Sequence, residues 1–158
     1  MRIWINNRQR KTAINPESLR TKAAKILNAL GWSMAELSIT LVNDRTMAKL
    51  NRVTFGRRGP TNVIAFPVEG VRPEDSPLPM TYPEGPGPPL VLGEVVISVE
   101  TTRRQAAELG WPWEELFDFY LIHGILHLLG YGHDTPESEA VMEAKTWEIM
   151  ELLGEGKG

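Results

Sequence analysis

The chain has 158 residues, of which 42% are hydrophobic and 23% are charged, and its formal net charge is −3. These values are typical of one globular domain and exclude strong disorder. The mild acidity argues against a general affinity for nucleic acids, which depends on lysine and arginine neutralising several phosphates.

The first half of the chain alternates predicted strands and helices. Residues 2–6 are expected to form a short strand. The sequence Asn-Pro-Glu at 15–17 supplies an N-cap, a proline at the first helical position and an early acid, which predicts a helix that ends at Gly31. Apolar residues alternate over 37–41 as in a half-buried strand, and a second helix is predicted over 43–56.

A loop and two more strands are expected next. Residues 57–62 are rich in turn formers and lead into a predicted strand over 63–67. Residues 68–89 hold seven of the twelve prolines, so we expect an extended or flexible loop there with no packed element. A fourth strand is predicted over 90–98, where Gly93 marks either a bulge or a close backbone approach.

Three helices are predicted in the last third of the chain. A short helix covers 100–109, Pro112 opens a long apolar helix, and the Thr-Pro-Glu sequence at 135–137 starts a last helix that ends at Gly154. Four residues of the long helix are expected to share its buried side: Leu116, Phe119, Tyr120 and Leu126. The pattern predicts a single α+β domain over 1–158, with a small mixed sheet of about four strands packed with helices.

No segment of the sequence predicts export or membrane insertion. Residues 1–11 lack an apolar stretch of signal-peptide length, and the most apolar segment, 116–129, is too short and too polar to span a bilayer. The absence of cysteine fits a reducing compartment. We therefore expect a soluble cytoplasmic protein that does not contact a membrane.

All three histidines of the chain fall inside one window of eleven residues. His123 and His127 are four residues apart on the predicted long helix, so their side chains lie on the same face. Gly130 is placed to end the helix in a left-handed conformation, and the turn that follows would let His133 swing back toward the other two rings. This arrangement predicts a metal site on the long core helix and the following turn.

Three histidine ligands describe an open metal site. Structural zinc normally has four protein ligands, whereas catalytic zinc leaves one position to water, so the predicted ion is catalytic. Zinc is the leading candidate, and nickel, copper or iron also fit. The alternative is that the histidines of the helix are packed, hydrogen-bonded core residues. Peptide hydrolysis is disfavoured, because Gly124 stands where zinc peptidases carry their general-base glutamate.

Arg57 and Arg58 form a pair in a glycine-flanked loop. A guanidinium group can hold a phosphate through two parallel hydrogen bonds, which makes both residues candidates for RNA contact. Paired surface arginines are more often simple solvated charges, and that interpretation stays open on charge alone.

The histidine window HGILHLLGYGH closely resembles the HGxLHLxGYDH signature of the YbeY family of bacterial metal-dependent endoribonucleases. Leu50-Asn51, followed after eight residues by PTNVIAFP, resembles the family's LN and PTNVLSFP block, and LGEVVIS at 92–98 resembles its LGDIVIS strand. With Glu139 and Met142 also in pattern, the similarity covers most of residues 37–154.

The resemblance implies a single-strand-specific endoribonuclease that acts in small-subunit rRNA 3′-end maturation and ribosome quality control. It implies one zinc-like ion held by His123, His127 and His133, and a basic wall that guides phosphates. In this chain we expect His123 and Arg57 to act in catalysis and Arg57 and Arg58 to contact the RNA. The implied partners are rRNA and the ribosomal small subunit, together with a small-subunit ribosomal protein and an assembly GTPase.

The chain departs from the family at two positions. Phe55 stands where the family usually has an arginine, so the phosphate-binding role could pass to Arg57 or Arg58, or be absent from this chain. Gly132 replaces the usual aspartate, and Asp134 could orient a ligand histidine in its place. Two alternatives therefore stand beside the nuclease: a non-catalytic, metal-binding ribosome assembly factor, and a zinc hydrolase of peptides or small amides.

Overall fold

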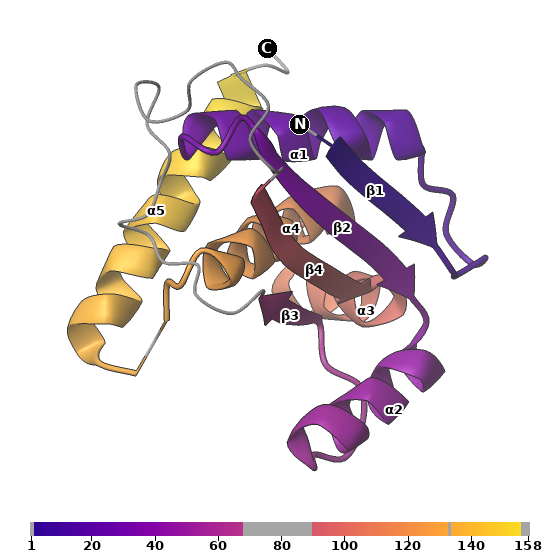
Figure 1. Ribbon diagram of the computed structural model, residues 1–158. Helices are drawn as coiled ribbons and strands as arrows, with labels where there is room; N and C mark the ends of the chain where they lie inside the picture. Colours follow the sequence, from indigo (N-terminus) through magenta and orange to yellow (C-terminus); the bar gives the residue numbers. More distant parts are fainter. Residues whose placement is uncertain (1, 68–89, 133, 156–158) are drawn as a thin grey trace.

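The computed structural model of the chain describes residues 2–67, 90–132 and 134–155 (Figure 1). These residues form four strands and five helices in the order β1 (Arg2–Asn7), α1 (Pro16–Ala29), β2 (Ala35–Val42), α2 (Asp44–Phe55), β3 (Val63–Pro67), β4 (Leu90–Ser98), α3 (Val99–Leu109), α4 (Trp113–Leu128) and α5 (Pro136–Glu155). Each predicted helix and strand is confirmed to within a few residues. The predicted loop at 68–89 lies outside the described residues.

The strands form one mixed sheet in the order β1-β2-β4-β3. β1 and β4 run parallel to β2, whereas β3 runs antiparallel to β4 at the edge. The predicted α+β domain with a four-stranded mixed sheet is therefore confirmed. Among the described residues β3 pairs only with β4, and α4 packs against both strands.

Gly93 lies both at a β-bulge and at a close backbone approach, the two alternatives that its position in the predicted strand suggests. The register between β2 and β4 shifts between Glu36 and Leu37, so that Glu36 pairs with Val91 and Leu37 with Gly93. Gly93 has φ 135°, and a Cβ added to it would lie 2.2 Å from the carbonyl oxygen of Phe66. A side chain there would separate β3 from β4.

The main core lies between one face of the sheet and helices α1, α4 and α5. Alternate residues of the strands enter it, including Leu37, Ile39, Val95 and Ile97, which are at most 1% exposed. The other face is covered at one end by α2, where Met47 packs in a second cluster with Val42, Ile64 and Val96. Figure 1 shows α2 below the sheet, joined to β3 by a loop.

Helix boundaries follow the capping residues in the sequence. Asn15 Oδ1 accepts hydrogen bonds from the backbone N–H groups of Glu17 and Ser18, and Asn43 Oδ1 accepts one from Thr46. Gly56 ends α2 in the left-handed conformation, with φ 66°. Gly130 follows α4 with φ 93°, as the sequence predicts.

The expected buried side of α4 is partly wrong. Leu116 and Leu126 are buried, but Phe119 and Tyr120 are only half-buried, because they lie on the side of the helix that carries His123. The residues that enter the core are instead Phe117, Leu121, Ile122, Ile125 and Leu128. None of the helices in the described part of the chain is long and apolar enough to cross a membrane.

Candidate metal and RNA site

His123 and His127 form a pair on the outer side of α4. Their spacing of four residues stacks them one helical turn apart, and their Nε2 atoms are 3.1 Å from each other. The ring centroids are 4.7 Å apart and the ring planes meet at 78°. Both side chains are half-buried, so the two nitrogens converge on one point at the protein surface.

The separation of the two nitrogens suits ligands of a common ion. Two nitrogens that each lie about 2.0–2.1 Å from one tetrahedral zinc ion are roughly 3.3 Å apart. The third predicted ligand, His133, lies outside the described residues. Within residues 2–67, 90–132 and 134–155, no third histidine or carboxylate completes a ligand set with the pair. The donor chemistry and geometry of His123 and His127 therefore fit two adjacent positions around a metal ion.

Gly124 explains how α4 presents these histidines. A Cβ added to Gly124 would lie 2.6 Å from Cγ1 of Val95 and 3.1 Å from Cγ2 of Val63. The missing side chain lets α4 pack closely on β3 and β4, with both histidines directed to one side of the contact. A glutamate at this position has no room, which removes the general base that a peptidase of the HExxH type needs.

The pair lines a cavity of about 440 Å³ between α2, β3 and α4. Its wall also includes Asn51 and Phe55 of α2, Arg57 of the following loop, and Thr61 and Asn62 before β3. The volume lies within the range of about 300–1,000 Å³ that is usual for small-molecule sites. The cavity therefore has room for one nucleotide beside the histidines.

The loop between α2 and β3 is held by two asparagines. Asn51 is 5% exposed, and its Nδ2 donates to the carbonyl oxygen of Gly59 at 3.0 Å. The carbonyl oxygen of Asn62 accepts from Ser98 N at 2.9 Å, and Asn62 Nδ2 donates to Gln105 Oε1 at 3.3 Å. These bonds hold the loop at Gly59 and Asn62, and the backbone N–H of Arg57 donates to the carbonyl oxygen of Asn51 at 3.4 Å.

Tyr120 extends this network on α4, one turn before His123. Its hydroxyl donates to Gln105 Oε1, the atom that Asn62 also contacts. Burial raises the pKa of the Tyr120 hydroxyl, and its hydrogen-bond contact with Asn62 acts in the opposite direction. The phenol therefore stays protonated at neutral pH and can donate this hydrogen bond continuously.

The remaining predicted site residues differ in their positions. Arg57 lines the cavity, and its guanidinium carbon is 5.8 Å from the ring centroid of Phe55. Arg58 is exposed and does not line the cavity. Asp134 is exposed, with its Oδ2 at 3.8 Å from the position that a Cβ on Gly132 would take.

Two cavity residues were not predicted as functional from the sequence. Phe55 is identified there only as a departure from a family pattern, and Asn62 only as part of the PTN sequence. The signal that could have found Asn62 is its place in that motif, immediately before a strand. The contact of Phe55 with Arg57 has no sequence signal, because it depends on the turn at Gly56.

An ion-pair network lies outside the cavity, where β2 and β4 end. Asp44 accepts hydrogen bonds from Ser98 Oγ at 2.7 Å, from Thr101 Oγ1, and from Arg104 Nη1 at 2.8 Å. Partial burial raises the pKa of the Asp44 carboxyl, but the donors at Thr101, Arg104 and Ser98 outweigh it and hold the pKa below its ordinary value. This network joins the starts of α2 and α3.

Comparison with known proteins identifies similar chains over nearly the whole length. The model of the family described as endoribonuclease YbeY matches residues 4–154. Endoribonuclease YbeY of Symbiobacterium thermophilum is 41% identical over 161 residues, which cover 98% of each chain. The protein of the same name from Geobacter sulfurreducens is 40% identical and covers 99% of this chain and 98% of its own.

A solved structure has the same fold. The solution structure of TM1509 from Thermotoga maritima aligns with a TM-score of 0.67 and 25% sequence identity. The alignment covers 98% of this chain and 91% of that protein.

Proposed function

We propose that the chain cleaves single-stranded RNA in the cavity between α2, β3 and α4, because it belongs to the YbeY family of metal-dependent endoribonucleases. The observation that carries this proposal is the pair of imidazole nitrogens 3.1 Å apart in a cavity that Arg57 also lines. A metal ion held beside a guanidinium group can offset the negative charge that develops on a phosphodiester during cleavage.

The metal in this proposal is one zinc ion per chain, bound by His123, His127 and His133. The distance between the first two ring nitrogens supports their part, and the left-handed turn at Gly130, three residues before His133, supports the third ligand. When bound, the ion supplies a Lewis-acidic positive charge at the scissile phosphate. Asp134 follows His133 directly, and we assign it the role of orienting that ring.

The chain's own residues position the RNA and offset its charge. Arg57 is placed to contact the phosphate that is cut, because it lines the same cavity as His123. Arg58, exposed on the same loop, contacts a neighbouring phosphate. Through its place in the ligand set, His123 belongs to the catalytic centre. Asn62 and Asn51 keep this wall in place through the backbone contacts of their loop.

Two nucleophiles fit this site, water and the 2′-hydroxyl of the RNA itself. Attack by the 2′-hydroxyl leaves a cyclic phosphate or a 3′-phosphate, whereas attack by water does not require that hydroxyl. A substrate with one deoxynucleotide on the 5′ side of the cut separates them. Loss of cleavage would assign the 2′-hydroxyl, and retained cleavage would assign water.

The biological substrate that we propose is the 3′ end of small-subunit rRNA, in the cytoplasm, in maturation and in quality control of the ribosome. The proposed partners are the small subunit, one of its proteins and an assembly GTPase. Membership of the family supports this assignment.

The experiment that tests the substrate uses precursor small subunits with an unprocessed, end-labelled 3′ extension. Zinc-loaded protein is expected to cut the single-stranded extension, and a duplex formed with a complementary oligonucleotide should be protected. His127→Ala protein controls for contaminating nucleases. The proposed substrate would be contradicted if the protein cut an unrelated structured RNA as well as it cut the extension. It would also be contradicted if the protein did not cut the extension.

A further inference from the structure

Phe55 is an exposed aromatic residue at the edge of the histidine cavity. Its side chain is 53% exposed at the end of α2, yet it lines the same cavity as His123 and His127. Val53, two residues earlier, is 74% exposed and does not line the cavity. Covering exposed apolar surface of this kind with a ligand is favourable. Phe55 lies where the substrate of the site would cover it.

The ring of Phe55 is oriented by Arg57. Gly56 adopts the left-handed conformation, so the chain turns back and places the guanidinium carbon of Arg57 5.8 Å from the ring centroid. A planar guanidinium group stacks on an aromatic face and still has N–H groups for a phosphate. The pair therefore offers an aromatic surface and an anion-binding group that are close enough to contact the base and the phosphate of one nucleotide.

The surroundings of the pair are fixed in the structure. The Gly56 N–H donates to the carbonyl oxygen of Arg52 at 2.9 Å, and Asn51 donates to Gly59 on the other side of the turn. A platform that is already ordered loses little conformational entropy on binding. Phe55 can therefore contribute to affinity without reorganisation of the loop.

We propose that Phe55 is the stacking platform for an unpaired base next to the scissile phosphate, and that Arg57 holds that phosphate beside the ring. This inference rests on the proposed function and names the feature of RNA that the site selects. Stacking on an aromatic side chain tolerates any base, but it needs a base whose face is free. In a duplex both faces of each internal base are covered, so the platform selects single strands without reading their sequence.

The test measures kcat/KM for a single-stranded RNA oligonucleotide and for versions with one abasic nucleotide on either side of the cut. Phe55→Ala should lower kcat/KM for the intact oligonucleotide by about five- to a hundredfold. Phe55→Trp should retain cleavage, because it keeps an aromatic face. Val53→Ala removes exposed apolar surface from the same helix turn and should stay within about twofold of the parent.

The abasic substrates distinguish stacking from a structural role of Phe55. At one of the two positions, loss of the base should lower kcat/KM of the parent by a factor similar to that of Phe55→Ala, and it should have little further effect in that variant. If the losses of kcat/KM from base removal and from Phe55→Ala multiplied at both positions, the base and the ring would act independently, and the proposal would be overturned. Parent-like cleavage by Phe55→Ala would overturn it as well.

A binding measurement separates this inference from the proposed function. Anisotropy of the fluorescently labelled oligonucleotide, measured with His127→Ala protein in the presence and absence of the second change Phe55→Ala, reports the platform without cleavage. Weaker binding of the doubly substituted protein would support the platform even if the parent cut no RNA, and in that case the proposed function alone would fail. Equal binding would overturn the platform, and Phe55 would then be available to a protein partner.

Discussion

Gly124 of α4 lies so close to Val95 of β4 that a Cβ on the glycine would come within 2.6 Å of Cγ1 of the valine. Real carbon atoms do not approach one another so closely without displacement of one of them. The contact lies between His123 and His127 along the helix, and it also involves Val63 of β3. The position of the histidine pair over the sheet edge therefore depends on the absence of a side chain at 124.

Gly124→Ala is expected to move α4 away from the sheet. Overpacking of a core contact costs about 1–3 kcal/mol, so the free energy of unfolding in urea should fall by that amount. RNA cleavage should fall as well, because the histidines shift relative to Arg57. Gly154→Ala is the matched control, since a Cβ there meets no atom within 4 Å. A Gly124→Ala protein as stable as the parent would show that the helix can relax without cost.

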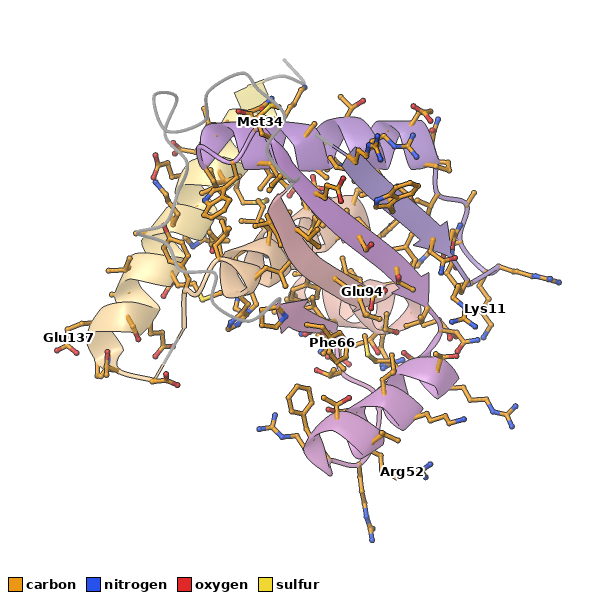
Figure 2. The ribbon with its side chains drawn as sticks, in the orientation of Figure 1. Lys11, Met34, Arg52, Phe66, Glu94 and Glu137 are labelled. Carbon is orange, nitrogen blue, oxygen red and sulfur yellow. The ribbon has the colours of Figure 1, made fainter. Side chains whose placement is uncertain are left out.

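Arg57→Ala should lower kcat/KM for single-stranded RNA by about ten- to a hundredfold, because a charged hydrogen bond to the phosphate is lost. The slope of log affinity against log salt concentration should become shallower by about 0.7, the value for one phosphate contact on a single strand. Arg52→Ala is the control. Arg52 is exposed on α2 outside the cavity, and Figure 2 shows it on the outer side of that helix. Equal losses in the two variants would mean that only general charge matters.

Asp44→Asn should destabilise the protein at neutral pH and make no difference in strong acid. The pKa of the Asp44 carboxyl is lowered in the folded protein, so its contribution to stability is present above the unfolded pKa of about 3.9. That contribution is lost as the pH falls through the folded pKa. Urea unfolding at a series of pH values should show a constant difference between pH 5 and 7 that shrinks below pH 4. A difference that does not change with pH would contradict the proton linkage.

Lys22→Met should destabilise the fold more than loss of a surface charge does. Lys22 Nζ lies 2.6 Å from Oδ1 of Asp118, whose side chain is only 2% exposed on the core side of α4. Removing the lysine takes away the positive charge that Lys22 places beside a buried carboxylate, which costs about 3 kcal/mol in unfolding free energy. The double variant Lys22→Met, Asp118→Leu should recover most of this loss. If it were as unstable as the single variant, the ion pair itself would not be the cause.

The sequence was sufficient to predict the helices and strands and to place His123 and His127 on one helix face. The N-caps Asn15 and Asn43 have local signatures, because the hydrogen bonds they make join residues two or three positions apart. The spacing of His123 and His127 likewise places both rings on one helix face whatever the tertiary structure. Local geometry therefore determines the part of the site that lies on one element.

The parts that the sequence could not predict depend on how elements meet. Helical periodicity placed Phe119 and Tyr120 on one stripe with Leu116, but only the position of the sheet decides which edge of that stripe is buried. The contact of Arg57 with Phe55 depends on the left-handed turn at Gly56. The lack of space at Gly124 depends on the distance between a helix and a sheet.

In the proposed function, the pair of His123 and His127 belongs to the centre that cuts RNA. The most direct measurement compares zinc content and cleavage of an end-labelled single-stranded RNA by the parent and by His127→Ala, with equal thermal unfolding temperatures as the test of folding. We predict one zinc ion per chain and cleavage in the parent, and loss of both in the variant. A folded His127→Ala protein that cuts RNA as fast as the parent would show that the histidine pair is not part of that centre.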